Sequence, residues 1–194
     1  MQRELTENEV REHDRAFAEG GGLMKGEVML ADAGPVGKPG WFARRKLSKA
    51  IRCFETALRI NREGWQSLWA LGKIYQRLEQ TTEALSYFQC AHDLNPKQPD
   101  VAREAGIAAI DAGDGVAAVR FSRAALAAQP EDPGILANLA LAHLINGELQ
   151  AARQAIDKSL GRAPKDGISR AISKIIEDVT AGKRPQPRTG REIK

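Results

Sequence analysis

The chain has 194 residues, of which 42% are hydrophobic and 28% charged, the proportions of an ordinary globular protein. No apolar run reaches the roughly 18 residues of a membrane-spanning helix, and the acidic, polar start lacks the apolar core of a secretory signal. We therefore expect a cytoplasmic protein with no membrane role. The net charge of +4 arises in two short stretches: residues 38–52 carry six bases and no acid, and residues 183–194 carry five bases and one acid.

The chain begins with a stretch that is predicted to be helical. Residues 7–19 have the composition of a helix, and three consecutive glycines at positions 20–22 are expected to end it. Glycine in a helix interior is less favourable than alanine by about 1 kcal/mol. Residues 1–21 are therefore predicted to be an N-terminal helical extension, and a further short helix is expected at residues 23–33.

A divergent first repeat is predicted over residues 22–64. The stretch at residues 34–45 contains three glycines and two prolines, which disfavour a regular helix. We interpret this stretch as an inserted basic loop. It would connect the helix at residues 23–33 to a helix at residues 47–60.

From this helix onward, the chain repeats with a period of 34 residues. Four columns of equivalent positions share that spacing: Ala50, Ala84, Ala118 and Ala152; Ala57, Ala91, Ala125 and Ser159; Phe54, Phe88, Ser122 and Ile156; Pro96, Pro130 and Pro164. Each unit holds two apolar stretches of helical period, and the proline follows the second stretch. The pattern predicts an all-α protein, an α-solenoid of antiparallel helix pairs, with units at residues 65–98, 99–132 and 133–166.

The end of the chain changes character after the last repeat. Residues 167–182 have an apolar stripe and a polar side, which is typical of a terminal capping helix with one face in water. The stripe consists of Ile168, Ile172, Ile175, Ile176 and Val179. Residues 183–194 contain two prolines and no apolar periodicity, so they are predicted to be a disordered basic tail.

The clearest unit, residues 65–98, resembles the tetratricopeptide repeat (TPR) family. It reads Leu68-x2-Leu71-Gly72-x2-Tyr75, then Ala84-x3-Phe88, Ala91 and Pro96, with Leu68 in place of the usual Trp. The resemblance implies about three to four TPR units plus the capping helix. Small residues at Gly72, Ala84 and Ala91 are expected to let the paired helices approach closely.

The resemblance also implies where a partner would bind, because the family uses a concave groove lined by the first helix of each pair. By position, the groove residues are Trp69, Lys73, Gln76, Arg77, Arg103, Ile107, Asn138, Leu141 and Leu144. Some members clamp a peptide C-terminus with Lys, Arg and two Asn residues. Of that pattern only Asn138 and Arg103 stand here, and Ile107 replaces an Asn, so binding of that type is not expected. The main prediction is a non-enzymatic interaction module that binds a peptide or helix of a partner protein.

The inserted loop offers a second candidate contact. It places two aromatic residues beside several bases, namely Lys38, Trp41, Phe42, Arg44 and Arg45. Such a set can contact an acidic or phosphorylated partner. The alternative is that Trp41 packs on the first hairpin and the bases only face water.

The sequence offers no constellation that predicts catalysis, a cofactor or a metal site. His143 occupies the column of Tyr75, which favours a packed core residue over a general base. Cys53 and Cys90 lack metal-binding spacing and are expected to be buried thiols.

Two other functions remain as alternatives. One is a small secretion-type or assembly chaperone, in which the N-terminal helix serves as a dimerisation arm of a homo-oligomer. The other, ranked last, is nucleic-acid binding through residues 38–52 and the basic tail, which predicts an affinity that falls steeply with salt.

Overall fold

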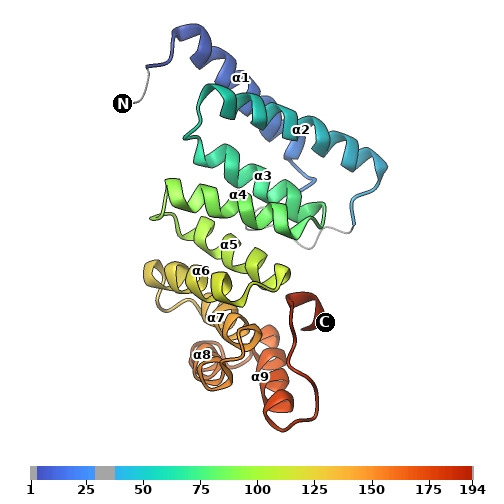
Figure 1. Ribbon diagram of the computed structural model, residues 1–194, viewed down its shortest axis with the longest axis vertical. Helices are drawn as coiled ribbons and strands as arrows, with labels where there is room; N and C mark the ends of the chain where they lie inside the picture. Colours follow the sequence, from blue (N-terminus) through green and yellow to red (C-terminus); the bar gives the residue numbers. More distant parts are fainter. Residues whose placement is uncertain (1–3, 29–37, 194) are drawn as a thin grey trace. The chain divides into compact units, whose positions relative to one another are not determined.

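A computed structural model describes residues 4–28 and 38–193, and every regular element in these residues is helical (Figure 1). The chain divides into two compact units, unit 1 (Met1–Asn95) and unit 2 (Pro96–Lys194). The helices are α1 (Glu7–Met24), α2 (Trp41–Ile60), α3 (Trp65–Arg77), α4 (Thr81–Leu94), α5 (Pro99–Ala112), α6 (Gly115–Ala128), α7 (Pro133–Ile145), α8 (Leu149–Arg162), α9 (Gly167–Thr180) and the short 3-10 helix η1 (Gly190–Ile193).

The 34-residue period of the sequence is a structural period. The helices α3, α5, α7 and α9 begin at residues 65, 99, 133 and 167, and α4, α6 and α8 begin at residues 81, 115 and 149. As a result Ala84, Ala118 and Ala152 are each the fourth residue of a second helix, and each is at most 1% exposed. Within each unit the paired helices pack on one another. The expected fold class, an all-α protein built from antiparallel helix pairs, is confirmed.

Small residues set the distance between the paired helices. A Cβ atom built on Gly72 would lie 2.7 Å from the Phe88 ring, and one built on Gly106 would lie 3.0 Å from the Ser122 hydroxyl. The two partners stand in the same sequence column. In each pair a small residue on the first helix therefore faces the same position of the second helix, which explains the periodic pattern.

The first hairpin differs from the prediction at its start. Helix α1 continues through Gly20–Gly22 to Met24 and packs on α2, so it is the first helix of the first pair and not an extension. A Cβ atom on Gly20 would lie 3.0 Å from the Phe54 ring. Gly20 thus has the role of Gly72, because close packing on an aromatic ring outweighs the low helix propensity of glycine. The boundary predicted between residues 1–21 and 22–64 is wrong.

The connection between α1 and α2 also differs from the expected one. Residues 25–28 form a turn in place of the expected helix at 23–33, whose remainder lies outside the described residues, as do residues 34–37 of the expected loop. Residues 38–40 are not helical, but α2 already begins at Trp41. The Arg44 N–H donates to the Gly40 carbonyl at 3.0 Å, which closes the first turn directly after the last glycine of the stretch. The expected loop at 34–45 is therefore wrong for its last five residues.

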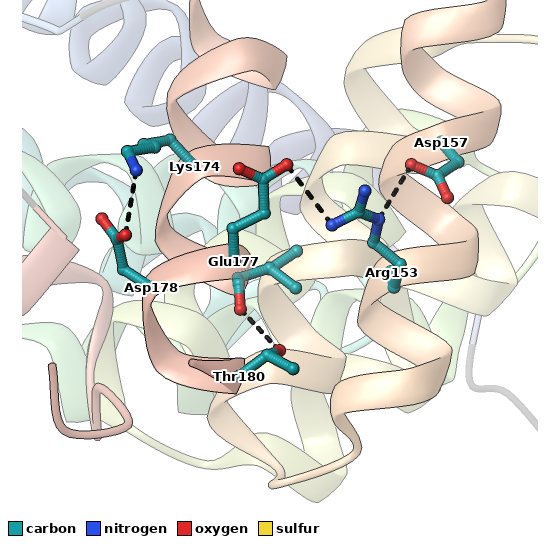
Figure 2. A network of polar contacts seen from close by, with 7 residues as sticks. Arg153, Asp157, Lys174, Glu177, Asp178 and Thr180 are labelled. Atoms are coloured by element: carbon teal, nitrogen blue, oxygen red, sulfur yellow. Dashed lines mark hydrogen bonds and ion pairs between the residues drawn. The ribbon is translucent and has the colours of Figure 1, made fainter. Parts of the chain in front are cut away.

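The last full-length helix, α9, packs on α8 and α7 as a terminal cap. Ile172, Ile175 and Ile176 are buried as expected, whereas Ile168 is 70% exposed. Ser169, expected on the polar side, is buried, and its hydroxyl lies 2.8 Å from that of Ser159. Figure 2 shows the polar edge of this contact, where Arg153 of α8 bridges Asp157 on its own helix and Glu177 on α9 at 3.3 and 3.4 Å. Exposed pairs of this kind stabilise the contact only weakly, by less than about 1 kcal/mol.

The expected disorder of the basic tail is wrong for residues 183–193, which fold back within unit 2 (Figure 1). Pro187 is fully buried, and η1 contacts α5. The tail also closes on itself, since Arg188 N–H donates to the Glu192 carboxylate at 3.0 Å. Composition predicted disorder because the tail has no apolar stripe of its own, but a single buried proline and local hydrogen bonds suffice to order it against a preformed surface.

Candidate functional site

The residues predicted to bind a partner lie on the first helices of three pairs, α3 in unit 1 and α5 and α7 in unit 2. We call the face of each helix that carries them its site face. Residues three or four positions apart share a face of a helix, so each site face follows from the spacing. Because each unit is a separate compact body, the two sets are described in turn.

In unit 1 the site face of α3 is buried at Lys73 and engaged in contacts within the unit at Trp69 and Arg77. Lys73, predicted to line the groove, is only 4% exposed. Trp69 and Gln76 are half-buried, and Trp69 packs against the hydrophobic core. The indole Nε1 of Trp69 is enclosed and has no acceptor among the described residues. This face therefore offers much less free surface than the sequence predicted.

A segment of the same unit covers the end of α3. The Arg77 Nε donates to the Glu27 carbonyl at 2.7 Å. On either side of it, Met24 and Val28 are 5% and 4% exposed and join the core cluster that includes Ile74. Met24 and Val28 thus anchor this turn in the packed interior, while Lys25 and Gly26 are exposed. Arg77, predicted to contact a partner, instead binds the protein's own backbone.

In unit 2 the site faces of α5 and α7 stay partly open. The half-buried residues are Arg103 and Ile107 on α5, and Asn138 and Leu141 on α7. The two helices contact each other, so these side chains belong to one surface. Arg103 also pairs with Asp100 at 3.1 Å. This surface presents two apolar side chains with one guanidinium and one amide, which suits an amphipathic segment.

Leu144 does not belong to this surface. It is fully buried, because α7 contacts α5, α6, α8 and α9 and is covered on most sides. Helix α7 is apolar nearly all round, which fits either burial on both faces or a face kept for a partner. Burial accounts for Leu144, while Leu141 remains half-buried at the surface. The expectation that Leu144 binds a partner is therefore wrong.

The C-terminal ends of α5 and α7 carry the folded-back tail. Gln186 Nε2 donates to the Ile145 carbonyl at 3.3 Å. A Cβ atom on Gly113 would lie 2.8 Å from the Arg188 carbonyl oxygen, so the tail backbone passes directly over the end of α5. The sequence analysis missed this contact. No apolar period marks the tail, and its only signal is Pro187, which looks the same in sequence as the exposed Pro185.

The start of α2 exposes two aromatic rings. Trp41 is 64% and Phe42 81% exposed, and their ring centroids are 4.7 Å apart in an edge-to-face arrangement. The Arg45 guanidinium lies 5.7 Å from the Trp41 ring centroid, within cation–π distance. Trp41 therefore does not pack away on the first hairpin. Arg44 is also exposed, and its Nε donates to the Pro39 carbonyl at 3.2 Å.

Several bases of residues 38–52 are paired within unit 1. Lys38 lies 3.6 Å from Glu79, Lys46 lies 3.2 Å from Glu27, and Lys49 lies 2.8 Å from Glu19. These acids partly neutralise the stretch that appeared uniformly basic in the sequence. A nucleic acid would have to compete with them for three of the six bases.

The histidine that was weighed as a general base makes a structural contact. His143 is 4% exposed and contacts the Glu148 carboxylate across the turn between α7 and α8, and this hydrogen bond lowers the pKa of Glu148. Residues 4–28 and 38–193 contain no group of three or more side chains arranged to hold a metal ion. Cys53 is half-buried, but Cys90 is exposed, so the expected burial of both thiols is wrong for Cys90.

A hollow of about 740 Å³ lies where the start of α1 meets the end of α2, lined by mixed charges including Glu12 and Arg59.

Comparisons with known proteins agree with this architecture. Residues 42–99 and residues 109–174 each match a family model described as tetratricopeptide repeat. Curated protein sequences gave no match. No helix in the described part of the chain is long and apolar enough to span a membrane.

Solved structures with the same fold are distant in sequence. A crystal structure of MamA is 15% identical, with 89% of this chain and 84% of that chain covered and a TM-score of 0.72. YrrB, described as a TPR protein with an unusual peptide-binding site, is 22% identical over 69% of each chain, with a TM-score of 0.61. A tetratricopeptide repeat protein from Parabacteroides merdae ATCC 43184 is 17% identical over 89% of this chain and 61% of that chain, with a TM-score of 0.68. At these identities the likeness shows the fold alone.

Proposed function

This chain belongs to the tetratricopeptide repeat family, and we propose that it is a non-enzymatic interaction module that holds a segment of a partner protein on the site faces of α5 and α7. The observation that carries the proposal is the half-buried row of Arg103, Ile107, Asn138 and Leu141 on two helices in contact. The family's fold supports a protein partner. The peptide-binding site named for YrrB supports a peptide as the bound form.

The chemistry of this row defines the bound segment. Ile107 and Leu141 favour apolar side chains of the partner, because the contact removes apolar surface of both proteins from water. Arg103 favours a carboxylate near one end, and Asn138 can donate to and accept from a backbone amide. The partner segment is therefore apolar at its centre and carries an acid at its edge.

The test compares two surface substitutions on unit 2. Leu141→Asp places a charge in the proposed contact, whereas Val116→Asp changes a side chain that is 72% exposed on the second helix α6. With the chain as bait in extract of its native cell, Leu141→Asp should lose the captured partner by at least tenfold, and Val116→Asp should keep it. Both variants should retain the helical circular dichroism spectrum. Equal capture by the two variants would refute the proposed surface.

The exposed aromatic pair at the start of α2 supports a second contact. Trp41 and Phe42, with Arg45 beside them, form an apolar and cationic surface that suits an acidic segment of a protein. Replacing both rings with alanine should weaken capture of a partner that binds there and leave the helical spectrum unchanged. Binding that is insensitive to this double replacement would remove the second contact.

The remaining alternatives keep little support. The chaperone proposal relied on the N-terminal helix as a free dimerisation arm, yet α1 is packed on α2. A homo-oligomer stays a prediction, which light scattering on the purified chain measures directly. Nucleic-acid binding predicts an affinity that falls steeply with salt, and a chain that retains no nucleic acid at low salt would exclude it.

A further inference from the structure

We infer that the C-terminal ends of α5 and α7 form a recognition site for an extended, basic, proline-containing segment, and that the chain's own residues 186–190 occupy this site as a displaceable internal ligand. The inference rests on the proposed function in one respect, because a partner segment on the adjoining site faces of unit 2 would meet the tail. It goes beyond that function in assigning the tail a regulatory role.

The tail makes ligand-like contacts with the two helix ends. Gln186 donates to the Ile145 carbonyl, and Pro187 is fully buried. The backbone then passes over Gly113, where any Cβ atom would meet the Arg188 carbonyl oxygen at 2.8 Å. At Gly190 a Cβ atom would meet an Asp111 carboxylate oxygen at 2.6 Å. The site thus requires a donor, a proline and a glycine in the order Gln-Pro-x-x-Gly.

The electrostatics of the site explain the basic character of its ligand. The C-terminus of a helix has unpaired carbonyl groups and a partial negative charge, so it favours donors and cations. Two such ends, those of α5 and α7, meet the tail, and Asp111 adds a carboxylate beside them. Residues 183–194 carry five bases and one acid. The docked residues 186–190 include one of these bases, Arg188, so the tail brings positive charge to these partly negative helix ends.

The tail borders the surface proposed for the partner. Ile110 and Ile145, which the tail contacts, lie three and four residues after Ile107 and Leu141 on the same helices. Positions with this spacing share a helix face. A partner segment that extends along the site faces would therefore meet the tail, and either would exclude the other from the helix ends.

The tail can leave without unfolding unit 2. Within residues 183–193 only Pro187 is buried, and part of the tail's hydrogen bonding is internal, as between Arg184 and the Glu192 carbonyl at 3.0 Å. Segments with few buried apolar contacts open at low free energy while the rest of the protein stays folded. A separate basic, proline-containing segment can compete for the helix ends once the tail is released.

The test uses the full chain and a fluorescent peptide with the sequence of residues 183–194. Pro187→Ala in the chain should speed tryptic cleavage after Arg188 at least fivefold and raise the affinity for the added peptide at least tenfold over the unchanged chain. Pro185→Ala is the matched control for peptide binding, because Pro185 is exposed, and it should leave the peptide affinity unchanged. Gly190→Leu blocks docking sterically and should act like Pro187→Ala.

A further variant tests the helix side of the contact. Gly113→Ala should abolish peptide binding even in the Pro187→Ala chain, while Gly182→Ala should not. Both glycines have positive φ, of 78° and 67°, but only Gly113 has the tail within 4 Å, so Gly182→Ala controls for backbone strain. If the tail variants release the tail yet bind no peptide, or leave cleavage unchanged, the inference is overturned. In that case the proposed partner surface would still stand if capture of the partner depends on Leu141. Conversely, if capture does not depend on Leu141, binding of the tail peptide would be unaffected.

Discussion

In each unit, a segment of that unit covers the C-terminal end of the site face. The two covering segments differ in how much apolar surface they bury. In unit 1 the covering residues Met24 and Val28 are 5% and 4% exposed and belong to the hydrophobic core. In unit 2 the cover is the tail, in which only Pro187 is buried. Burial stabilises by roughly 25 cal/mol per Å² of apolar surface, so the first cover is structural and the second can detach.

This difference explains why the partner surface is proposed in unit 2. A cover that shares the core cannot leave without unfolding the hairpin, so Lys73 and Arg77 of α3 stay engaged. The tail is held by one buried proline and a few hydrogen bonds, so a similar segment can replace it. Which site face is accessible thus depends on what covers it and not on the repeat alone.

The largest expected effect separates the two covers directly. Met24→Ala should lower the free energy of unfolding by about 2–5 kcal/mol, the range for removing a buried methionine side chain from a core. Pro187→Ala should lower it by only about 1.4 kcal/mol, the free energy that corresponds to a tenfold competition by the tail, because the tail is released without loss of the helical core. Urea denaturation followed by circular dichroism measures both. A similar loss for the two variants would mean that the tail is also a structural cover.

The next effect compares the helix contacts of the two units. Gly72→Ala should destabilise by about 1–3 kcal/mol, because the new methyl group meets the Phe88 ring at 2.7 Å. Gly106→Ala should cost less, since the Ser122 hydroxyl at 3.0 Å can rotate away. Gly21→Ala is the control and should stabilise by up to about 1 kcal/mol, because nothing lies within 4 Å and alanine favours a helix. The same denaturation series checks the order of the three.

A smaller effect concerns two arginines that the sequence placed in one groove. Arg77→Met removes the hydrogen bond to the Glu27 carbonyl and should destabilise unit 1 by about 1 kcal/mol. Arg103→Met removes a half-exposed pair with Asp100 on the same helix and should cost no more than about 0.5 kcal/mol. If Arg103 proves the more important for stability, the closed and open faces have been assigned to the wrong units.

The smallest expected effect is a pH dependence of unit 2. Hydrogen bonding from the Ser169 side chain, and then from its backbone N–H, lowers the pKa of Asp166, which caps α9. A lowered pKa means that the cap stabilises the fold above the ordinary pKa of the carboxyl and that this contribution is lost as the pH falls through the lowered value. Asp166→Asn should cap equally well at neutral pH and show a smaller acid-induced drop in melting temperature. An unchanged acid profile would contradict the role of this carboxyl.

The comparison also shows which predictions a periodic sequence supports. The positions of Ala84, Ala118 and Ala152 were predictable because every pair of helices needs a small residue at the same contact. The first pair escaped the same reasoning. From Gly72 to Ala84 the separation is 12 residues, but from Gly20 to Ala50 it is 30, so the insertion moved the equivalent glycine out of register. The prediction therefore relied on the local tendency of consecutive glycines to end a helix. It placed the helix end at Gly20–Gly22, where the structure packs Gly20 on the Phe54 ring.

The site was predictable only in part. Spacing placed Ile107 and Leu141 on neighbouring helices, since a helix face follows from position alone. Spacing could not predict that Leu144 is buried, because that depends on the four helices around α7. The same holds for Lys73, which is 4% exposed although nothing in its own helix suggests burial.

The sequence by itself determined the repeat, the helix pairs and the family, because these depend on short-range periodicity and on residue size at recurring contacts. Only the tertiary structure decided which site face is open. Residues 24–28 and 183–193 have no periodic signal, and they are ordered by surfaces that exist only after the helices have packed. Covering contacts of this kind join segments far apart in the chain, so their energy is a property of the fold and not of the local sequence.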